Sequence, residues 1–110
     1  MNFEITDGTA VIFKSSDLNR DFVTNFKNVY TKLKQKNIIL ILSESQILNN
    51  DLIENILKIS HTHNKGKYSF VFVSDHPNPN EIKAEISWAP TLQEAFDIIE
   101  IEEIQRDLEF

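Results

Sequence analysis

Residues 37–42 read Asn37-Ile38-Ile39-Leu40-Ile41-Leu42, and this stretch decides the fold class of the 110-residue chain. Five consecutive apolar residues follow Asn37. A short, uninterrupted apolar run is typical of a central β-strand that is covered on both faces, as strands of parallel sheets are. The run therefore predicts a buried strand over 38–42, with helices to cover it.

Two short strands and a helix are predicted before this run. Phe3-Glu4-Ile5-Thr6 alternates apolar and polar residues, and the Asp7-Gly8 pair that follows is a strong signal for a hairpin turn. Ala10-Val11-Ile12-Phe13 supplies the second strand. Ser15-Ser16-Asp17 are good N-cap residues for the helix. Its apolar positions recur at helical intervals: Phe22, Phe26, Val29, Tyr30 and Leu33.

A second helix and a further strand are predicted after the run. Apolar residues at helical spacing place the helix from Asn49 or Asn50 to the Asn64-Lys65-Gly66 turn, with Gly66 as its C-cap. Residues 68–73 form a strongly β-prone segment. The two prolines within 75–80 require a loop there.

The chain ends in the most clearly marked helix of the sequence. Residues 81–88 fit either a helical turn or a strand, and a strand at 86–88 is favoured. Thr91 as N-cap and Glu94 three residues later form a capping box for a helix over about 91–108. The order β-β-α-β-α-β-(β)-α predicts a single α/β domain over residues 1–110. We expect a mixed, mainly parallel sheet of about five strands with helices packed on it.

The charge of the chain is concentrated at its C-terminal end. The chain has 17 acidic and 11 basic residues, a net charge of −6 and no cysteine. Residues 1–90 contain equal numbers of acidic and basic residues. The excess acids therefore lie in the last twenty residues, where Arg106 is the only base. This charge disfavours nucleic acid and anionic membranes as main partners, and no apolar run approaches the roughly 20 residues of a membrane span. We expect a cytoplasmic protein without disulfides or thiolate metal sites.

At about 100° per residue, the C-terminal helix carries two apolar faces. One suits packing on the sheet and comprises Leu92, Ala95, Phe96 and Ile99. The other lies roughly opposite and comprises Ile98, Ile101, Ile104 and Leu108, with Glu100, Glu102, Glu103 and Asp107 beside it. A surface helix of a small domain needs only one such face. We therefore expect Ile101, Ile104 and Leu108 to fold back on the chain's own core, to form a homodimer, or to contact a different protein.

Residues 42–53 carry a resemblance to a known family. They read Leu42-Ser43-Glu44-Ser45-Gln46-Ile47-Leu48-Asn49-Asn50-Asp51-Leu52-Ile53, at the start of the second predicted helix. Their order and spacing resemble the pattern D-L-S-x-x-x-x-[IM]-D-S-S-G-L of STAS domains, the sulfate transporter and anti-sigma factor antagonist family. The strand Phe70-Val71-Phe72-Val73 and the helix start Pro90-Thr91-Leu92-x-Glu94-Ala95 also correspond. The resemblance implies a mainly parallel sheet with helices on one side, and recognition of a protein partner.

The chain departs from this pattern at the family's phosphorylation switch. Asn49 replaces the aspartate, Asn50 and Asp51 replace the two serines, and Leu52 replaces the glycine. A partner kinase phosphorylates the second serine in anti-sigma factor antagonists, so the resemblance implies a module without this switch. Asp51 carries one negative charge, less than the roughly −1.5 to −2 of a phosphoserine. Asn49, Asn50 and Asp51 either cap the helix or form a partner surface that resembles the phosphorylated site.

His61-Thr62-His63 is the one pattern that suggests a metal. Metallo-β-lactamase-type nucleases, ribonuclease Z among them, use H-x-H-x-D-H to bind two zinc ions. Here Asn64 and Lys65 follow, so the aspartate and the third histidine are missing, and residues i and i+2 of a helix point in different directions. With only two glycines, a phosphate-binding loop is also excluded. We therefore expect no metal, no cofactor, no catalytic residue and no ribonuclease Z activity.

The function expected from the sequence is that of a non-catalytic protein-binding or regulatory module of a bacterial cytoplasm. The resemblance implies a role like that of an anti-sigma factor antagonist, without the phosphorylatable serine. The alternative is an accessory or structural subunit that docks on a larger enzyme through its acidic C-terminal helix.

Overall fold

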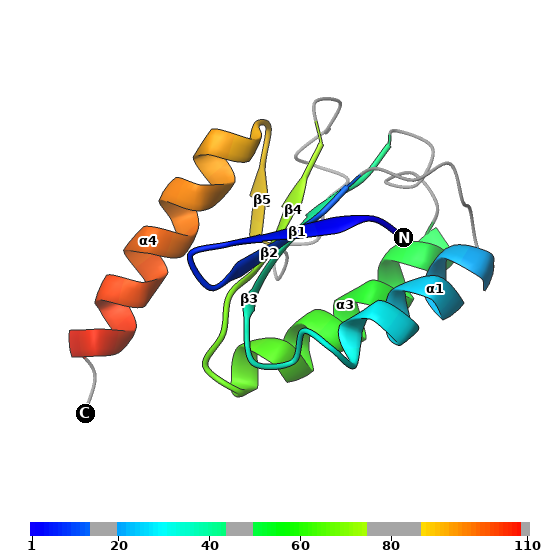
Figure 1. The fold of residues 1–110 in the computed structure, drawn as a ribbon, viewed down its shortest axis with the longest axis horizontal. Coiled ribbons are helices and arrows are strands. Elements are labelled where there is room, and N and C mark those ends of the chain that lie inside the picture. The colour runs from blue at the N-terminus through cyan, green and yellow to red at the C-terminus, as the bar shows by residue number, and fades with distance from the viewer. Residues whose placement is uncertain (14–19, 44–49, 75–86, 109–110) are drawn as a thin grey trace.

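Five strands form one mixed sheet in the same order as they occur in the chain (Figure 1). The structure is a computed structural model that describes residues 1–13, 20–43, 50–74 and 87–108. The first pair of strands is antiparallel and each later pair is parallel. The predicted mixed, mainly parallel sheet is therefore confirmed. The strands are β1 (Phe3–Thr6), β2 (Thr9–Ile12), β3 (Asn37–Ile41), β4 (Phe70–Val73) and β5 (Ser87–Ala89).

The turn between β1 and β2 has the backbone that the Asp7-Gly8 pair predicts. Asp7 has a φ of 50° and Gly8 a φ of 79°. Positive φ at both central residues defines the type I′ turn, whose twist matches that of the flanking strands. Thr6 consequently pairs with Thr9, and the hairpin places β1 at the edge of the sheet.

Within the described residues, three helices cover the two faces of the sheet: α1 (Arg20–Tyr30), α3 (Asn50–Lys65) and α4 (Leu92–Leu108). Helices α1 and α3 connect parallel neighbouring strands. Because such crossovers are almost always right-handed, both helices lie on the same face. Helix α4 follows β5 and lies on the other face, so the molecule has three layers (Figure 1). The STAS resemblance implies helices on one side of the sheet, and α4 departs from that expectation.

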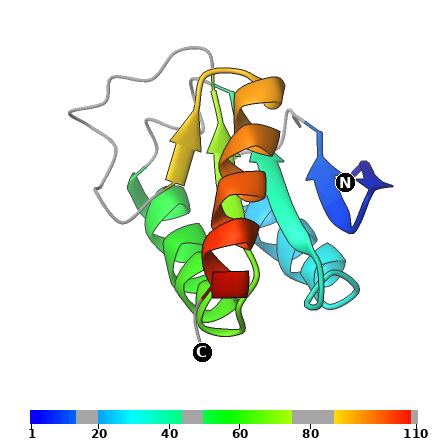
Figure 2. The same ribbon diagram turned by 90° about the vertical axis from the view of Figure 1, so that its left-hand side faces the viewer.

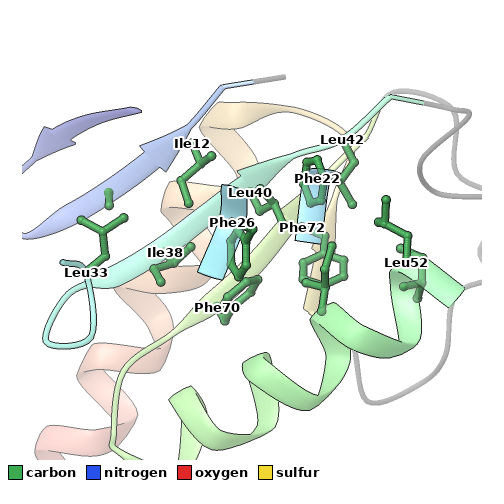
Figure 3. Close-up of a cluster of buried hydrophobic side chains, with 13 residues drawn as sticks. Ile12, Phe22, Phe26, Leu33, Ile38, Leu40, Leu42, Leu52, Phe70 and Phe72 are labelled. Carbon is green, nitrogen blue, oxygen red and sulfur yellow. The ribbon is translucent and has the colours of Figure 1, made fainter. Parts of the chain in front are cut away.

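The side chains of the strands alternate between two apolar clusters, as the period of two in a strand requires. Those on the side of α1 and α3 are Ala10, Ile12, Ile38, Leu40, Phe70 and Phe72. Those on the side of α4 are Val11, Ile39, Val71, Val73 and Ala89. Figure 3 shows how Phe22 and Phe26 of α1 and Leu52 of α3 meet the strands in the first cluster. The central strand is thus buried on both faces, as its apolar run predicts.

Helix α3 ends at Lys65 and Gly66 follows it directly, as the predicted C-cap requires. The left-handed conformation falls on the next residue, Lys67, with a φ of 69°. The amide of Gly66 donates to the carbonyl of His63 and the amide of Lys67 to that of Asn64. These i→i+3 bonds tighten the last turn and continue its right-handed path through Gly66, so the reversal falls on Lys67.

Of four other predicted features, two lie in the described residues and two lie outside them. The strand favoured at 86–88 is present as β5, from Ser87 to Ala89. Helix α3 begins at Asn50, as expected. The proposed N-cap Ser15-Ser16-Asp17 and the loop at 75–80 lie outside the described residues.

The N-cap of α4 gives a testable contribution to stability. The amide of Glu94 donates to Thr91 Oγ1 at 3.2 Å, which confirms the predicted cap. Thr91→Ala is therefore expected to lower the free energy of unfolding by about 1 kcal/mol in urea titrations. Thr62→Ala in α3 is the matched control, because Thr62 Oγ1 donates to the carbonyl of Lys58 within the helix and caps nothing. That variant should stay within about 0.5 kcal/mol of the parent chain, and equal losses in the two variants would contradict the assignment.

Candidate functional site

Helix α4 lies across β3, β4 and β5 and buries one side of its first three turns. Ala95 and Ile99 are the buried residues, and Phe96 and Ile98 pack around them against the second apolar cluster. The capped N-terminus of the helix lies at the carboxyl ends of the strands, and its far end lies where the strands begin. The helix therefore runs antiparallel to the parallel strands.

A polar network holds the far end of α4 to the sheet. Asn37, the buried first residue of β3, accepts a bond from the amide of Ser69 at 2.9 Å and donates to Glu103 Oε1 at 2.8 Å. Arg106 donates to Ser69 Oγ at 3.1 Å. Asn37 and Ser69 thus fix two residues of α4, one turn apart, and the helix keeps a defined orientation to its end.

Three large apolar residues in the second half of α4 are exposed. Ile101 is 55% exposed, Ile104 54% and Leu108 72%. We call these three residues the α4 row. Their i, i+3, i+7 spacing places them along one side of the helix. Of the three alternatives left open by the sequence, burial of the row in the chain's own core is therefore wrong.

Two other residues of this helix lie on a different side of it than the sequence predicts. Ile98, expected beside the exposed residues, is half-buried against the sheet, and Leu92, expected against the sheet, is 36% exposed. The helix is rotated about its axis relative to the prediction. Ala95 is small enough to let the helix approach the strands closely, and Arg106 must face the sheet to reach Ser69.

A groove of about 610 Å³ runs between α4 and the β1–β2 hairpin. Figure 2 shows α4 in front of the sheet, with the hairpin to one side. Ile104 of the row is one of its lining residues, so the row and the groove form one continuous surface. Among the described residues that line this groove, every charged one is acidic: Asp7, Glu100, Glu103 and Asp107. We call it the α4 groove.

The residues predicted at the start of α3 lie far from this surface. Asp51 is exposed in the first turn of α3, where its carbonyl accepts a bond from Asn55 Nδ2 at 2.8 Å. Asn50 is the first residue of the helix, its side chain lies outside the described residues, and Asn49 lies entirely outside them. The start of α3 and the far end of α4 occupy opposite layers and opposite ends of the strands (Figure 1). The two predicted sites are therefore separate surfaces.

His63 is a buried structural residue. Its Nε2 lies 2.6 Å from the carbonyl oxygen of Lys36, which can only accept, so Nε2 carries the proton. Nδ1 lies 2.9 Å from the hydroxyl of Tyr30, which therefore donates to it. Burial raises the pKa of Tyr30, so this hydroxyl stays protonated. Both ring nitrogens of His63 are thus occupied within the protein.

The second histidine of the pair has a different environment. His61 is exposed on α3, two residues from the buried His63, so the two imidazoles do not converge. Within the described ranges, no three His, Cys, Asp or Glu side chains are grouped so that they could hold a metal ion. In this pattern His63 therefore has a structural role: it is buried and hydrogen-bonded within the protein.

His63 makes the stability of the fold depend on pH. Burial lowers the pKa of His63, and the bond to the Lys36 carbonyl opposes this shift only in part. Between the lowered pKa and the unfolded value of about 6.5, the unfolded chain binds more protons than the folded one. The contribution of His63 to the free energy of unfolding should therefore be fully present above about pH 6.5. As the pH falls below this value, the free energy of unfolding should decline.

Urea titrations across this pH window test the prediction. His61→Gln, which removes the exposed imidazole, should keep the decline. A free energy of unfolding that does not change with pH, or a decline that disappears in His61→Gln, would contradict the role of His63.

A smaller pocket of about 220 Å³ lies at the carboxyl ends of β3 and β4, beside the start of α4. Ligands of α/β proteins often bind at this edge of the sheet. The lining is dominated by Ile41, Leu42, Val73, Pro90 and Leu92. Its volume is below the roughly 300–1,000 Å³ of typical ligand pockets, so the larger α4 surface is the stronger candidate.

Comparisons with known proteins add no family to this description. No protein-family model matches the chain, and no curated protein was found as a relative. Of the three helices in the described part of the chain, none combines the length and apolar character that crossing a membrane requires. The fold and the site together define an α/β domain with an exposed apolar row beside an acidic groove.

Proposed function

We propose that this chain is a non-catalytic protein-binding module of STAS-like type, which contacts proteins through two surfaces, the outer face of α4 and the start of α3. The α4 row carries this proposal. Scattered apolar residues are normal on a surface, but a continuous row beside a groove is typical of interaction sites. Full burial of an Ile or Leu side chain contributes about 1.5–3 kcal/mol, so a partner that covers the partly exposed row can gain roughly 1–2 kcal/mol from each residue.

The mainly parallel sheet and the crossover helices α1 and α3 support the STAS-like part of the proposal, whereas α4, on the other face, departs from the family's one-sided arrangement. Helices α1 and α3 lie on one face of a mainly parallel sheet, and α3 begins at Asn50, where the family pattern has its helix start. Asp51 is exposed there and accessible to a partner. Its carboxylate is also favourable near the positive end of the helix dipole. Because position 51 has no hydroxyl, binding at this surface is not regulated by phosphorylation of that residue.

Site-specific photo-crosslinking in the cell of origin tests this function. A photoreactive amino acid is placed at position 104 in the α4 row, at position 51 in α3, or at the exposed Lys58 as a control. We expect a defined protein adduct from position 104 and from position 51, and none from position 58. If position 104 gives no more adduct than position 58, the proposed function is wrong.

The same experiment distinguishes the alternative function. An accessory subunit that docks on a larger enzyme through α4 would give a single, stoichiometric adduct from position 104 and none from position 51. The separation of α4 from the start of α3 favours this alternative, because one small partner cannot easily reach both surfaces.

A further inference from the structure

We infer that the outer face of α4 binds a basic amphipathic helix of its partner. The inference rests on the proposed function and names the chemistry of the partner. Apolar side chains of that helix cover the α4 row, and its Lys or Arg side chains reach over Ile104 into the acidic α4 groove. The spacing of the row, the charge of the groove and the poor fit of a second copy each support it.

The α4 row has the geometry of a helix-packing surface. Ile101, Ile104 and Leu108 follow the a-d-a spacing of a heptad and extend over about 10 Å of the helix. An exposed row of this kind on a straight helix packs against a second helix with matching i, i+3, i+7 residues. The polar network around Asn37 keeps the row in place, so little ordering is needed when the partner binds.

The charges beside the row select a basic partner. No cation among the described residues is paired with Asp7, Glu100 or Asp107, and Arg106 is directed to Ser69 on the sheet side of the helix. Lys and Arg side chains are long enough to extend from a helix lying on the row into a neighbouring groove. Opposite charges across an interface also accelerate association and exclude wrongly charged partners.

A second copy of this chain fits the surface poorly. In a two-fold contact between two α4 helices centred near Ile104, Glu100 of each copy lies beside Asp107 of the other. Like charges at these flanking positions oppose pairing. The phosphates of a nucleic acid would be repelled by the same carboxylates. A basic amphipathic helix is the occupant that satisfies both the apolar row and the acidic groove.

Selection from a displayed library of helical peptides tests the inference. Each peptide carries Leu at i, i+3 and i+7, and the flanking positions vary among Lys, Glu, Gln and Ser. The full chain is the bait, and Ile104→Ser removes the centre of the row. Ile5→Ser is the matched control, because Ile5 is 49% exposed on β1 and its neighbours in register face the opposite layer.

We expect Lys to be enriched over Glu by about tenfold at the flanking positions. The selected peptides should bind Ile104→Ser about tenfold more weakly and Ile5→Ser equally well, with affinity falling in roughly 0.5 M salt. The inference is overturned if no peptide is enriched, if Glu is enriched as often as Lys, or if the peptides bind Ile104→Ser as tightly as the parent chain. A stable homodimer that Ile104→Ser dissociates would also overturn it, because a second copy would then be the occupant.

These outcomes separate the inference from the proposed function. If the selection fails while position 104 still forms a specific adduct in cells, the chain binds a partner of different chemistry. If both experiments fail, the proposed function is wrong as well.

Discussion

Phe26→Ala is expected to lower the free energy of unfolding by about 3–5 kcal/mol, because it opens a cavity at the centre of the first apolar cluster. Phe26 is fully buried. Its ring centroid lies 6.2 Å from that of Phe22 and 6.0 Å from those of both Tyr30 and Phe70. The rings of Phe22, Phe26 and Phe70 join α1 to β4 (Figure 3). Domains of this kind have a total stability of only about 5–15 kcal/mol, so the variant should be close to unfolding.

Urea denaturation followed by circular dichroism measures this loss. Phe26→Leu is the control variant, because it keeps most of the buried volume and should cost about 1–2 kcal/mol. A loss below about 1 kcal/mol for Phe26→Ala would contradict the packing of α1 on β4.

Asn37→Ala is expected to cost about 2–4 kcal/mol and to loosen the end of α4. The substitution leaves the buried amide of Ser69 without its acceptor and removes the donor to Glu103. An unsatisfied buried amide costs about 1–3 kcal/mol, and a hydrogen bond to a charged group contributes about 1.5–3 kcal/mol. Hydrogen exchange of the amides in residues 100–108 should accelerate in the same variant.

Two further variants control this experiment. Glu103→Gln keeps an acceptor for Asn37 and should cost only about 0.5–1.5 kcal/mol. Asn28→Ala removes an exposed amide side chain from α1 and should be nearly neutral. If Asn37→Ala loses no more stability than Glu103→Gln, the network does not hold α4 as described.

Most of the fold is predictable from the sequence because its signals are local. The apolar run of β3, the Asp7-Gly8 turn and the Thr91 cap each act over a few residues, and the structure contains all three. The right-handed crossover rule then places α1 and α3 on one face. The side of the sheet that α4 covers has no such local signal, because α4 does not connect two of the described strands.

The rotation of α4 about its axis depends on contacts between residues that are far apart in the sequence. The same is true of the polar network at the end of α4. Asn37 is 66 residues from Glu103 and 32 from Ser69, so no local pattern identifies this network. His63 is likewise bonded to Tyr30, 33 residues away. The sequence pattern around His63 raises the possibility of a metal site, which the missing ligands disfavour, and does not indicate this contact. The exposure of Ile101, Ile104 and Leu108 does not follow from the sequence alone, which also allows burial in the chain's own core; it depends on how α4 is oriented on the sheet.

Protein binding by the outer face of α4 is tested most directly by the yield of a photo-crosslink from position 108 in living cells, with and without Ile104→Ser. If the outer face of α4 binds a protein, position 108 forms a specific adduct whose yield falls about tenfold in Ile104→Ser and is unchanged in Ile5→Ser. Because Ile104 is exposed, Ile104→Ser should keep its free energy of unfolding within about 0.5 kcal/mol of the parent chain. An adduct whose yield Ile104→Ser leaves unchanged, or no adduct from position 108, would contradict the assignment of this surface.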